Sequence, residues 1–273
     1  MSHRLKKILG GSILALLAVY VVGCSKSGTS PAGTAKFQIN MIDGPGTFSA
    51  VNIVIDSIQA HIASSDSTSG WVTLNSAAGT YDLLQLVNGN SAMVANTSVP
   101  AGRYSQIRLF LGSGSNIVVA GASFPLVIPS GLQSGLKLNV DASVQSGTTY
   151  SMTLDFNVNS SIVVTGNPLN GQYILKPVIR VIVGPSNGVI DGSVLPHSAL
   201  PTITAFNSSD TVTTVADTSG DFKVTHLSTG SYDVDIVPSD TTLNDTTLTN
   251  VNVTAGQTTN VGTIILSTKN RAR

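Results

Sequence analysis

The sequence Leu136-Lys-Leu-Asn-Val-Asp-Ala-Ser143 decides the fold, because apolar and polar side chains alternate through it without interruption. Successive side chains of a strand point to opposite faces, so this alternation predicts a strand with one buried and one solvated face. Residues 150–157 repeat the pattern, and turn signals such as Asp43-Gly-Pro-Gly46 and Pro100-Ala-Gly102 separate the runs. Short strands at this spacing are typical of β-sandwiches and β-barrels. The chain is therefore predicted to be all-β.

The composition supports this fold class and excludes one class of partner. All 14 acidic residues are aspartate, and 14 basic residues balance them. Glutamate favours helix interiors, whereas aspartate favours turns and caps, so a chain without glutamate is expected to be poor in helix. The sequence has no basic stripe with interleaved aromatic residues, so we expect no nucleic-acid partner.

The amino-terminal residues have the order of a lipoprotein signal peptide. Basic residues precede an apolar run from Ile13 to Val22, and Gly23 stands before Cys24, the only cysteine of the chain. The apolar run is too short to span a bilayer. The order is similar to a bacterial lipobox, in which a diacylglycerol alkylates the thiol and the preceding peptide is removed. We therefore predict a signal peptide over residues 1–23 and lipidation at Cys24.

A lipidated cysteine predicts a chain anchored by lipid to a membrane of the bacterial cell envelope. Ser25 follows the cysteine, where some bacteria read an aspartate as a signal for retention in the inner membrane. The outer membrane or the cell surface is therefore favoured. The small polar residues 24–35 are expected to form a flexible tether between the lipid and the first domain.

Patterning divides the rest of the chain into two β-sandwich domains in tandem. Residues 36–184 form the first predicted domain, Gly184-Pro-Ser-Asn-Gly188 is a natural linker, and residues 188–267 form the second. Pro177 lies inside the most apolar run and has no N–H for a ladder, so it predicts an edge strand or a bulge there. Residues 82–87 fit either one helical turn or a strand.

Four motifs stand in order in the second domain: Gly188-Val-Ile-Asp-Gly-Ser-Val194, Ala216-Asp-Thr-Ser-Gly-Asp-Phe222, Leu227-Ser-Thr-Gly-Ser-Tyr-Asp-Val234 and Val251-Asn-Val-Thr-Ala-Gly256. With them, residues 188–266 resemble the carboxypeptidase regulatory-like, or prealbumin-like, β-sandwich. The resemblance implies a stalk or accessory module, with Phe222 and Tyr232 in its core. Related collagen-adhesin repeats often have a Lys–Asn cross-link, but residues 189–195 contain no lysine, so we expect none.

Several motifs of the first domain also occur in a recognisable order: Trp71-Val-Thr-Leu74, Pro100-Ala-Gly-Arg-Tyr-Ser-Gln-Ile-Arg-Leu109, Ile128-Pro-Ser-Gly131, Gly135-Leu-Lys-Leu138, Leu154-Asp-Phe156 and Leu175-Lys-Pro-Val-Ile-Arg-Val181. They resemble an uncharacterised family of bacterial lipoprotein domains, the domain of unknown function numbered 4382. The resemblance implies location and architecture but no activity. The family pattern tends to read Asp-Phe-Asp where this chain has Asn157, so a cation site built on that pair would be one carboxylate short.

No catalytic signature is found, and no catalytic residue is predicted. The chain has no Gly-x-Ser-x-Gly, His-Glu-x-x-His or phosphate-loop motif. His61, His197 and His226 lie far apart in sequence, although a Ser-His-Asp set converges only in three dimensions, so a hydrolase stays open as an alternative. The chain is expected to be no enzyme and to have no cofactor.

No metal site is predicted, although two aspartate pairs leave calcium open as an alternative. Asp233 and Asp235 alternate on one strand, and Asp217 and Asp221 flank a turn. Carboxylates are ligands for calcium, which takes six to eight oxygens. A solvated strand face and an Asx-turn explain the same two pairs, and nothing in the sequence resembles a calcium loop.

The candidate binding residues of the first domain are basic, with one aromatic partner: Arg103, Arg108, Lys176, Arg180 and Trp71. The basic side chains alternate with core positions, so we expect Arg108, Lys176 and Arg180 to project to the same side of their strands. With Asp155 or Asp141 they form either an ion-pair network or a pocket for an anionic ligand. Trp71 is either a core residue or a platform for a sugar ring.

Three functions are compatible with these patterns. The first is a non-enzymatic, membrane-anchored surface lipoprotein with a binding or structural role and a polysaccharide or protein ligand. The second is an accessory lipoprotein that binds glycan or cell-wall polymer, which exposed aromatic residues along a cleft would favour. The third is a hydrolase with an unrecognised site, which His61 within hydrogen-bond reach of a serine and an aspartate would favour.

Overall fold

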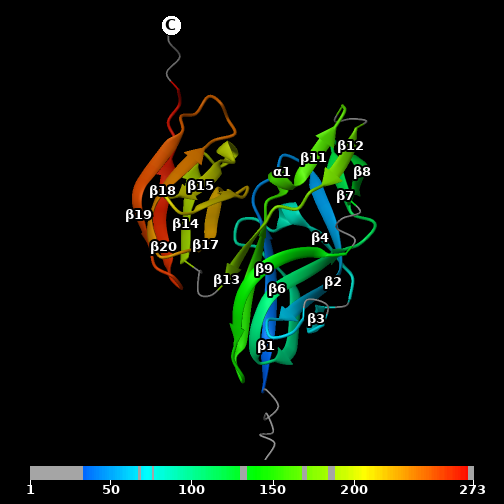
Figure 1. The fold of residues 1–273 in the computed structure, drawn as a ribbon. Coiled ribbons are helices and arrows are strands. Elements are labelled where there is room, and N and C mark those ends of the chain that lie inside the picture. The colour runs from blue at the N-terminus through cyan, green and yellow to red at the C-terminus, as the bar shows by residue number, and fades with distance from the viewer. Residues whose placement is uncertain are drawn as a thin grey trace, which may run out of the picture. The chain divides into compact units, whose positions relative to one another are not determined.

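A computed structural model describes residues 33–66, 69–75, 77–129, 134–167, 171–183 and 188–269. The predicted signal peptide, Cys24 and linker residues 184–187 lie outside these ranges. Strands dominate the described residues, so the predicted all-β fold class is confirmed (Figure 1). Within these ranges, no helix is both long enough and apolar enough to cross a membrane.

The first sandwich pairs a four-stranded sheet with a nine-stranded sheet. The four-stranded sheet has the order β13-β10-β1-β5, with β1 parallel to β10 and antiparallel to β5. Its strands are β1 (Thr34–Asp43), β5 (Ala92–Pro100), β10 (Thr149–Phe156) and β13 (Ile179–Val183).

The nine-stranded sheet has the order β11-β12-β8-β7-β2-β6-β9, and β3 and β4 also pair with β2. Its strands are β2 (Ala50–Ile62), β3 (Trp71–Asn75), β4 (Gly79–Asp82), β6 (Gly102–Leu111), β7 (Asn116–Val119), β8 (Ala122–Val127), β9 (Leu136–Val144), β11 (Ile162–Thr165) and β12 (Gln172–Leu175). The long strand β2 is the centre of this sheet, because it pairs with four others.

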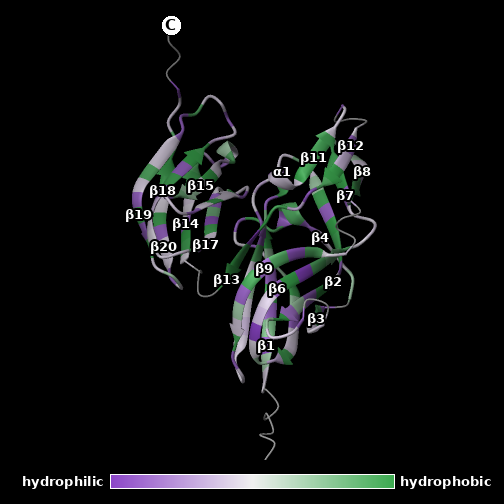
Figure 2. Cartoon of the chain, in the orientation of Figure 1, coloured by the Kyte–Doolittle hydropathy of each residue, from purple (hydrophilic) through white to green (hydrophobic). Residues whose placement is uncertain are grey.

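The core of the first sandwich forms from alternate residues of both sheets. Phe37, Ile39 and Met41 of β1 are fully buried, as are Ile107 and Leu109 of β6. Hydrophilic and hydrophobic positions alternate in colour along the strands (Figure 2). Burying apolar side chains contributes about 1.5–3 kcal/mol each, which makes this core the main source of stability. The remaining alternate positions of each strand are left for the outer faces.

In three places the structure changes a sequence-based expectation or decides between its alternatives. β1 begins at Thr34, inside the expected tether, because Thr34 pairs with Pro100 of β5. The apolar run containing Pro177 is divided into β12 and β13, and β13 is an edge strand, as a proline without a ladder donor favours. In residues 82–87, Leu83–Gln85 form a 3₁₀ turn that Asp82 caps by accepting from the Leu84 N–H at 3.2 Å.

The second sandwich has one sheet of order β17-β14-β20 and one of order β16-β15-β18-β19. Its strands are β14 (Gly188–Leu195), β15 (Thr202–Phe206), β16 (Thr211–Val215), β17 (Asp221–Leu227), β18 (Gly230–Val237), β19 (Thr246–Val253) and β20 (Thr258–Ile265). Phe222 and Tyr232 are buried, as expected. Gly220 adopts φ +82° in the turn before β17, a conformation that favours glycine. The described residues of both sandwiches belong to one compact unit.

Candidate functional site

The outer face of the nine-stranded sheet brings together three of the predicted binding residues. On β2, β6 and β9, Gln59, Arg108 and Lys137 stand in register, and His61 is in register with Trp71 of β3. Their neighbours in sequence, such as Ile58 and Ile107, are buried in the core, so strand alternation places this polar row outside. We call the outer surface of β3, β2, β6 and β9 around this row the Arg108 face.

Neutral groups hold the Arg108 guanidinium in place. Its central carbon lies 4.0 Å from the centroid of the Trp71 ring and 4.9 Å from that of Phe110. Nη2 donates to Oε1 of Gln59 at 2.6 Å, whereas Nε is buried and has no hydrogen-bond partner among the described residues. Aromatic faces attract a cation without neutralising it. Arg108 is therefore fixed in position and keeps its full positive charge.

His61 supports this arrangement from beneath Trp71. The two rings lie 4.9 Å apart at a tilt of 59°, and His61 is buried. Nε2 of His61 lies 2.9 Å from the main-chain oxygen of Asp66, and Nδ1 lies 3.2 Å from Oγ of Ser105. A carbonyl oxygen only accepts, so Nε2 is the nitrogen that bears a proton. A serine is in reach, but a main-chain carbonyl holds the other nitrogen, so the contacts of His61 do not form a Ser-His-Asp triad.

Arg103 lies on the same sheet but has a carboxylate partner. Its Nε and Nη2 donate to the two oxygens of Asp141 on β9 at 2.7 and 2.9 Å. The hydrogen bonds and charge of Asp141 raise the pKa of Arg103 above its usual value. Both side chains are about two-thirds exposed, so solvent screens the pair and it contributes little to stability. The ion pair expected with Asp141 is thus present, and it neutralises Arg103.

Arg180 lies on the other sheet, at the edge strand β13. Its guanidinium donates to Oδ2 of Asp155 at 2.8 Å and also bonds Asp210, which precedes β16 in the second sandwich. Burial is the main cause that raises the pKa of Asp155, and Arg180 opposes it. Lys176 lies in the connection between β12 and β13. The expectation that Arg108, Lys176 and Arg180 project to one side is therefore wrong for Arg108 and Arg180, because the chain places them on different sheets.

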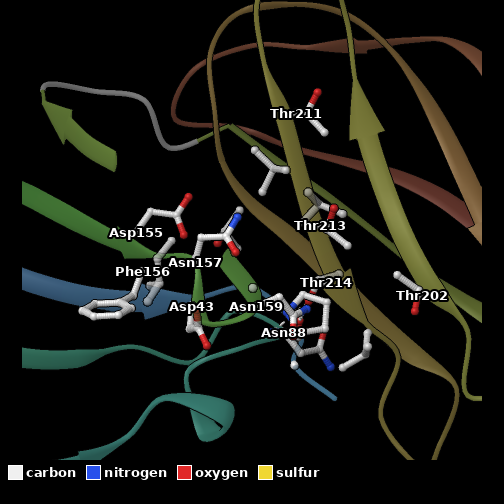
Figure 3. A pocket seen from close by; sticks show the side chains of 18 of the residues that line it. Asp43, Asn88, Asp155, Phe156, Asn157, Asn159, Thr202, Thr211, Thr213 and Thr214 are labelled. Carbon is white, nitrogen blue, oxygen red and sulfur yellow. Dashed lines mark hydrogen bonds between the residues drawn. The ribbon is translucent and has the colours of Figure 1, made fainter. Parts of the chain in front are cut away.

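A cavity of about 690 Å³ is lined by residues of both sandwiches. Asp43, Asn157 and Asn159 lie toward one side of it, whereas Thr211 and Thr213 approach from β16 (Figure 3). The lining combines hydroxyl, amide and carboxyl groups with apolar side chains, so it is suited to a small polar ligand.

Asn88 of the first sandwich forms hydrogen bonds to the second sandwich near this cavity. Its N–H donates to Oγ1 of Thr214 at 2.9 Å, and its Oδ1 accepts from the N–H of Lys223 at 2.6 Å. Its Nδ2 donates to the main-chain oxygen of Asp221 at 3.1 Å. The side-chain amide thus bonds the outer edge of β17 in the way that a neighbouring strand would.

Asp43 is the least satisfied acid of the cavity. It is 6% exposed at the end of β1, and its Oδ1 accepts from the N–H of Val158 at 3.0 Å. Its Oδ2 is buried and has no partner among the described residues. Burial is the main cause that raises its pKa to about 8, main-chain N–H groups oppose the rise, and Asp155 and Asp82 add to it. Sequence reasoning treated Asp43 only as part of a turn.

The two aspartate pairs considered for calcium bond to neighbouring groups of their own sandwich. Oδ1 of Asp233 accepts from the N–H of Asn250, and Oδ1 of Asp235 accepts from Oγ1 of Thr247. Oδ1 of Asp217 accepts from the N–H of Ser219 at 2.8 Å, which makes the expected Asx-turn, and also from the N–H of Asp221 at 3.0 Å. Within the ranges that the structure describes, no three histidine, cysteine, aspartate or glutamate side chains are grouped to hold a metal.

The fold and these sites define an all-β protein in which neutral groups hold an arginine on the outer face of the first sandwich. Residues 34–177, more than half of the 273-residue chain, match the model of a family described as "Domain of unknown function (DUF4382)". The chain belongs to this family, which agrees with the resemblance seen in its motifs. No curated protein matches the chain.

Several solved structures are similar to parts or most of the chain. The shaft pilin SpaA of Lactobacillus rhamnosus GG is 7% identical, with 88% of this chain and 99% of that one covered and a TM-score of 0.23. The minor pilin GBS52 of Streptococcus agalactiae is 11% identical, with 87% and 98% covered and a TM-score of 0.23. A type II cohesin–X-dockerin complex of Acetivibrio cellulolyticus is 20% identical, with 29% of this chain covered and a TM-score of 0.24.

The chain spans 57% of the matched cohesin–dockerin chain and 34% of the Bacillus anthracis TIE protein, another similar structure. All these TM-scores lie well below 0.5, so we base no conclusion about function on the similarities.

Proposed function

We propose that the chain is a lipid-anchored, non-enzymatic protein of the bacterial cell envelope that binds an acidic polysaccharide through the Arg108 face. The observation that supports this function is the guanidinium of Arg108, held between Trp71 and Phe110 and bonded to Gln59. An arginine fixed by neutral groups is preorganised for an anion, because little further conformational entropy is lost when the anion binds.

The charge of the surrounding face favours an anionic ligand. Lys137 is in register with Arg108 on the neighbouring strand and is exposed. The acid of β9, Asp141, is already paired with Arg103. A guanidinium has five N–H donors in a plane that matches a carboxylate. A polymer with repeated carboxylates could contact Arg108 and Lys137 at the same time. A neutral glycan has no anionic group that would neutralise these two charges.

The contacts of Trp71 favour recognition by charge over recognition by ring stacking. Its ring already packs against the guanidinium of Arg108 and the imidazole of His61. We infer that Trp71 serves to hold the cation, so the ligand is selected by its acidic groups. The second hypothesis, a neutral-glycan binder with Trp71 as the sugar platform, would need this stack to open.

The anchor rests on the sequence around Cys24, which lies outside the described residues. Several acyl chains hold a protein firmly in a bilayer, since each buried methylene contributes about 0.8 kcal/mol. Mass spectrometry of the membrane-extracted protein is expected to show an acylated amino terminus at Cys24. Cys24→Ser is expected to release the protein from membranes, and a variant that stays membrane-bound would contradict the anchor.

The binding function is tested by replacing Arg108 with glutamine and measuring retention on immobilised acidic polysaccharide and on a neutral analogue. Arg103→Gln is the matched control, because it removes the same charge from the same strand at a site already paired with Asp141. We expect Arg108→Gln to lose retention on the acidic polymer and Arg103→Gln to keep most of it. Equal retention by wild type and Arg108→Gln would reject the proposal, and retention on an envelope protein alone would point to a protein ligand.

A further inference from the structure

The turn that bonds the first sandwich to the second contains an asparagine followed by a glycine. Asn88 and Gly89 lie between the 3₁₀ turn Leu83–Gln85 and β5, and both have positive φ, +56° and +83°. Asparagine is a thermolabile residue, and a glycine after it leaves the next main-chain nitrogen unshielded by a side chain. Gly89 is also exposed to water. The pair therefore has the groups that spontaneous deamidation requires: a side-chain amide, an accessible nitrogen beside it, and water.

In the native fold this amide is held away from that reaction. Oδ1 of Asn88 accepts from the Lys223 N–H at 2.6 Å, and Nδ2 donates to the main-chain oxygen of Asp221 at 3.1 Å. The main-chain N–H of Asn88 donates to Oγ1 of Thr214 at 2.9 Å (Figure 3). Cyclisation turns the side-chain amide toward the nitrogen of Gly89, so both amide bonds to β17 must first break. The bonds to the second sandwich thus oppose the intrinsic reactivity of the pair.

We propose that Asn88 is a deamidation site, which the contact with the second sandwich protects and whose product weakens that contact. The nitrogen of Gly89 loses its proton to hydroxide and attacks Cγ of Asn88, which forms an N–Cγ bond. The Cγ–Nδ2 bond breaks, and Nδ2 leaves as ammonia after taking a proton from water, which regenerates the hydroxide. Water then opens the succinimide ring at either carbonyl and leaves aspartate or isoaspartate at position 88. One water is consumed, one ammonia is released, and nothing is oxidised or reduced.

The product cannot restore the native contact. A carboxylate oxygen takes the place of Nδ2 and only accepts, so it cannot donate to the main-chain oxygen of Asp221. Two acceptors then face each other at the edge of β17, which costs more than the lost bond alone. In the isoaspartate form, the main chain also gains a carbon between residues 88 and 89, which displaces the side chain from its partners. Opening of the contact permits deamidation, and deamidation keeps the contact open, so the pair acts as a one-way release.

The first test compares the rate of deamidation at Asn88 in the native full chain and in the chain unfolded by urea, both in mildly alkaline buffer. Peptide mapping by mass spectrometry measures the replacement of the Asn88 amide by a carboxyl group. A site that reacts only after local opening is slowed by the small population of the open state, so we expect a rate at least about tenfold lower in the native chain. Equal rates, or no conversion in urea, would overturn the proposal. This test needs no variant to fold.

The second test loosens the contact without changing Asn88. Thr214→Val removes the hydroxyl that accepts from the Asn88 N–H and keeps the shape of the side chain. We expect native-state deamidation to become about 2- to 10-fold faster, the change that loss of one hydrogen bond predicts. Thr213→Val is the matched control, because its hydroxyl belongs to the same strand but contacts that of Thr204, and it is expected to react at the wild-type rate. Equal rates in the two variants would overturn the proposal.

The third test concerns the product. Asn88→Asp reproduces the aspartate form, and hydrogen exchange measured by mass spectrometry is expected to be faster over β17 than in the wild type, because the edge of this strand loses its bond from Nδ2. Asn90→Asp is the matched control, because it adds the same charge two residues along at an exposed position, and it is expected to exchange as the wild type does. If both variants exchange alike, the product keeps the contact and the proposal is overturned. None of these tests involves the Arg108 face.

Discussion

Arg108 and Arg180 belong to the same sandwich and to similar alternating strands, yet their surroundings are opposite. Arg180 donates to Asp155 and also bonds Asp210. Arg108 lies against two aromatic rings and one amide. The first charge is neutralised inside the protein and serves stability. The second charge stays uncompensated on an outer face, where a ligand can use it.

Asp43 extends the comparison to a buried acid. Burial raises the pKa of Asp155, but this acid is paired with Arg180. Burial also raises the pKa of Asp43 to about 8, and no basic side chain of the described residues is paired with it. Burying a charge is tolerated when it is paired, and otherwise the group neutralises by binding a proton or a cation. The three sites therefore differ in what neutralises the charge: carboxylate side chains for Arg180, the proposed ligand for Arg108, and a proton for Asp43.

The largest expected effect is the pH dependence of the free energy of unfolding that arises from Asp43. Its pKa is about 8 in the folded chain and 3.8 at its usual value. Between these values the native state holds a proton that the unfolded state lacks, so the free energy of unfolding falls as pH rises. The slope is about 1.4 kcal/mol per pH unit, with roughly 6 kcal/mol as the upper bound over the window.

Urea unfolding at a series of pH values between 4 and 9 measures this dependence. Asp43→Asn keeps the shape but cannot ionise, so its profile is expected to be flatter through the window and higher at its alkaline end. Identical profiles for the wild type and Asp43→Asn would show that the carboxyl of Asp43 is already compensated in the protein.

The next effect in size is the loss of stability in Arg180→Gln. The substitution leaves Asp155 and Asp210 without their partner, and both are four-fifths buried or more. Breaking a fully buried pair costs about 3–5 kcal/mol, and partial exposure of Arg180 reduces this to about 2–3 kcal/mol. Urea unfolding measures it, with Arg103→Gln as the control expected to stay near wild type. An Arg180→Gln variant as stable as the control would remove the contrast between the two arginines.

Much of the fold could be predicted because alternation is a local signal. Residues 136–143, which alternate without interruption, lie within the strand β9 (Leu136–Val144). The missing N–H of Pro177 predicts an edge strand or a bulge, and β13 is an edge strand. It does not predict where the apolar run divides into β12 and β13. The 3₁₀ turn after Asp82 depended on a side-chain cap, which a strand pattern does not encode.

The partners of the candidate site could not be predicted, because they come from distant segments. Gln59 lies 49 residues before Arg108, and Asp210 lies 30 residues after Arg180. Alternation correctly placed both arginines opposite core positions, but each of the two sheets has its own outer face. Asp43 was missed because Asp-Gly-Pro-Gly is a strong turn signal, and a turn residue is normally solvated.

A third effect is expected on ligand affinity rather than on folding. Arg108→Gln removes a charge-assisted hydrogen bond to an anion, which is worth about 1.5–3 kcal/mol, or roughly 10- to 100-fold in affinity. Arg180→Gln is expected to leave the affinity for acidic polysaccharide unchanged, because its guanidinium is bonded within the protein. Titration of the polymer at two salt concentrations measures both variants. A larger loss in Arg180→Gln than in Arg108→Gln would reverse the assignment of roles.

The smallest expected effect is the coupling energy between Arg108 and the aromatic ring of Trp71. Trp71→Leu removes the ring at 4.0 Å from the guanidinium and keeps an apolar side chain in its place. A double-mutant cycle of Trp71→Leu with Arg108→Gln is expected to give a coupling energy of about 0.5–1 kcal/mol in urea unfolding, the range for a cation–π contact at a partly exposed site. Phe110→Leu removes the ring at 4.9 Å and is expected to couple more weakly. If Arg108 is instead held by its bond to Gln59 alone, both cycles will give a coupling energy near zero, and Gln59→Leu will reproduce the loss of retention by Arg108→Gln.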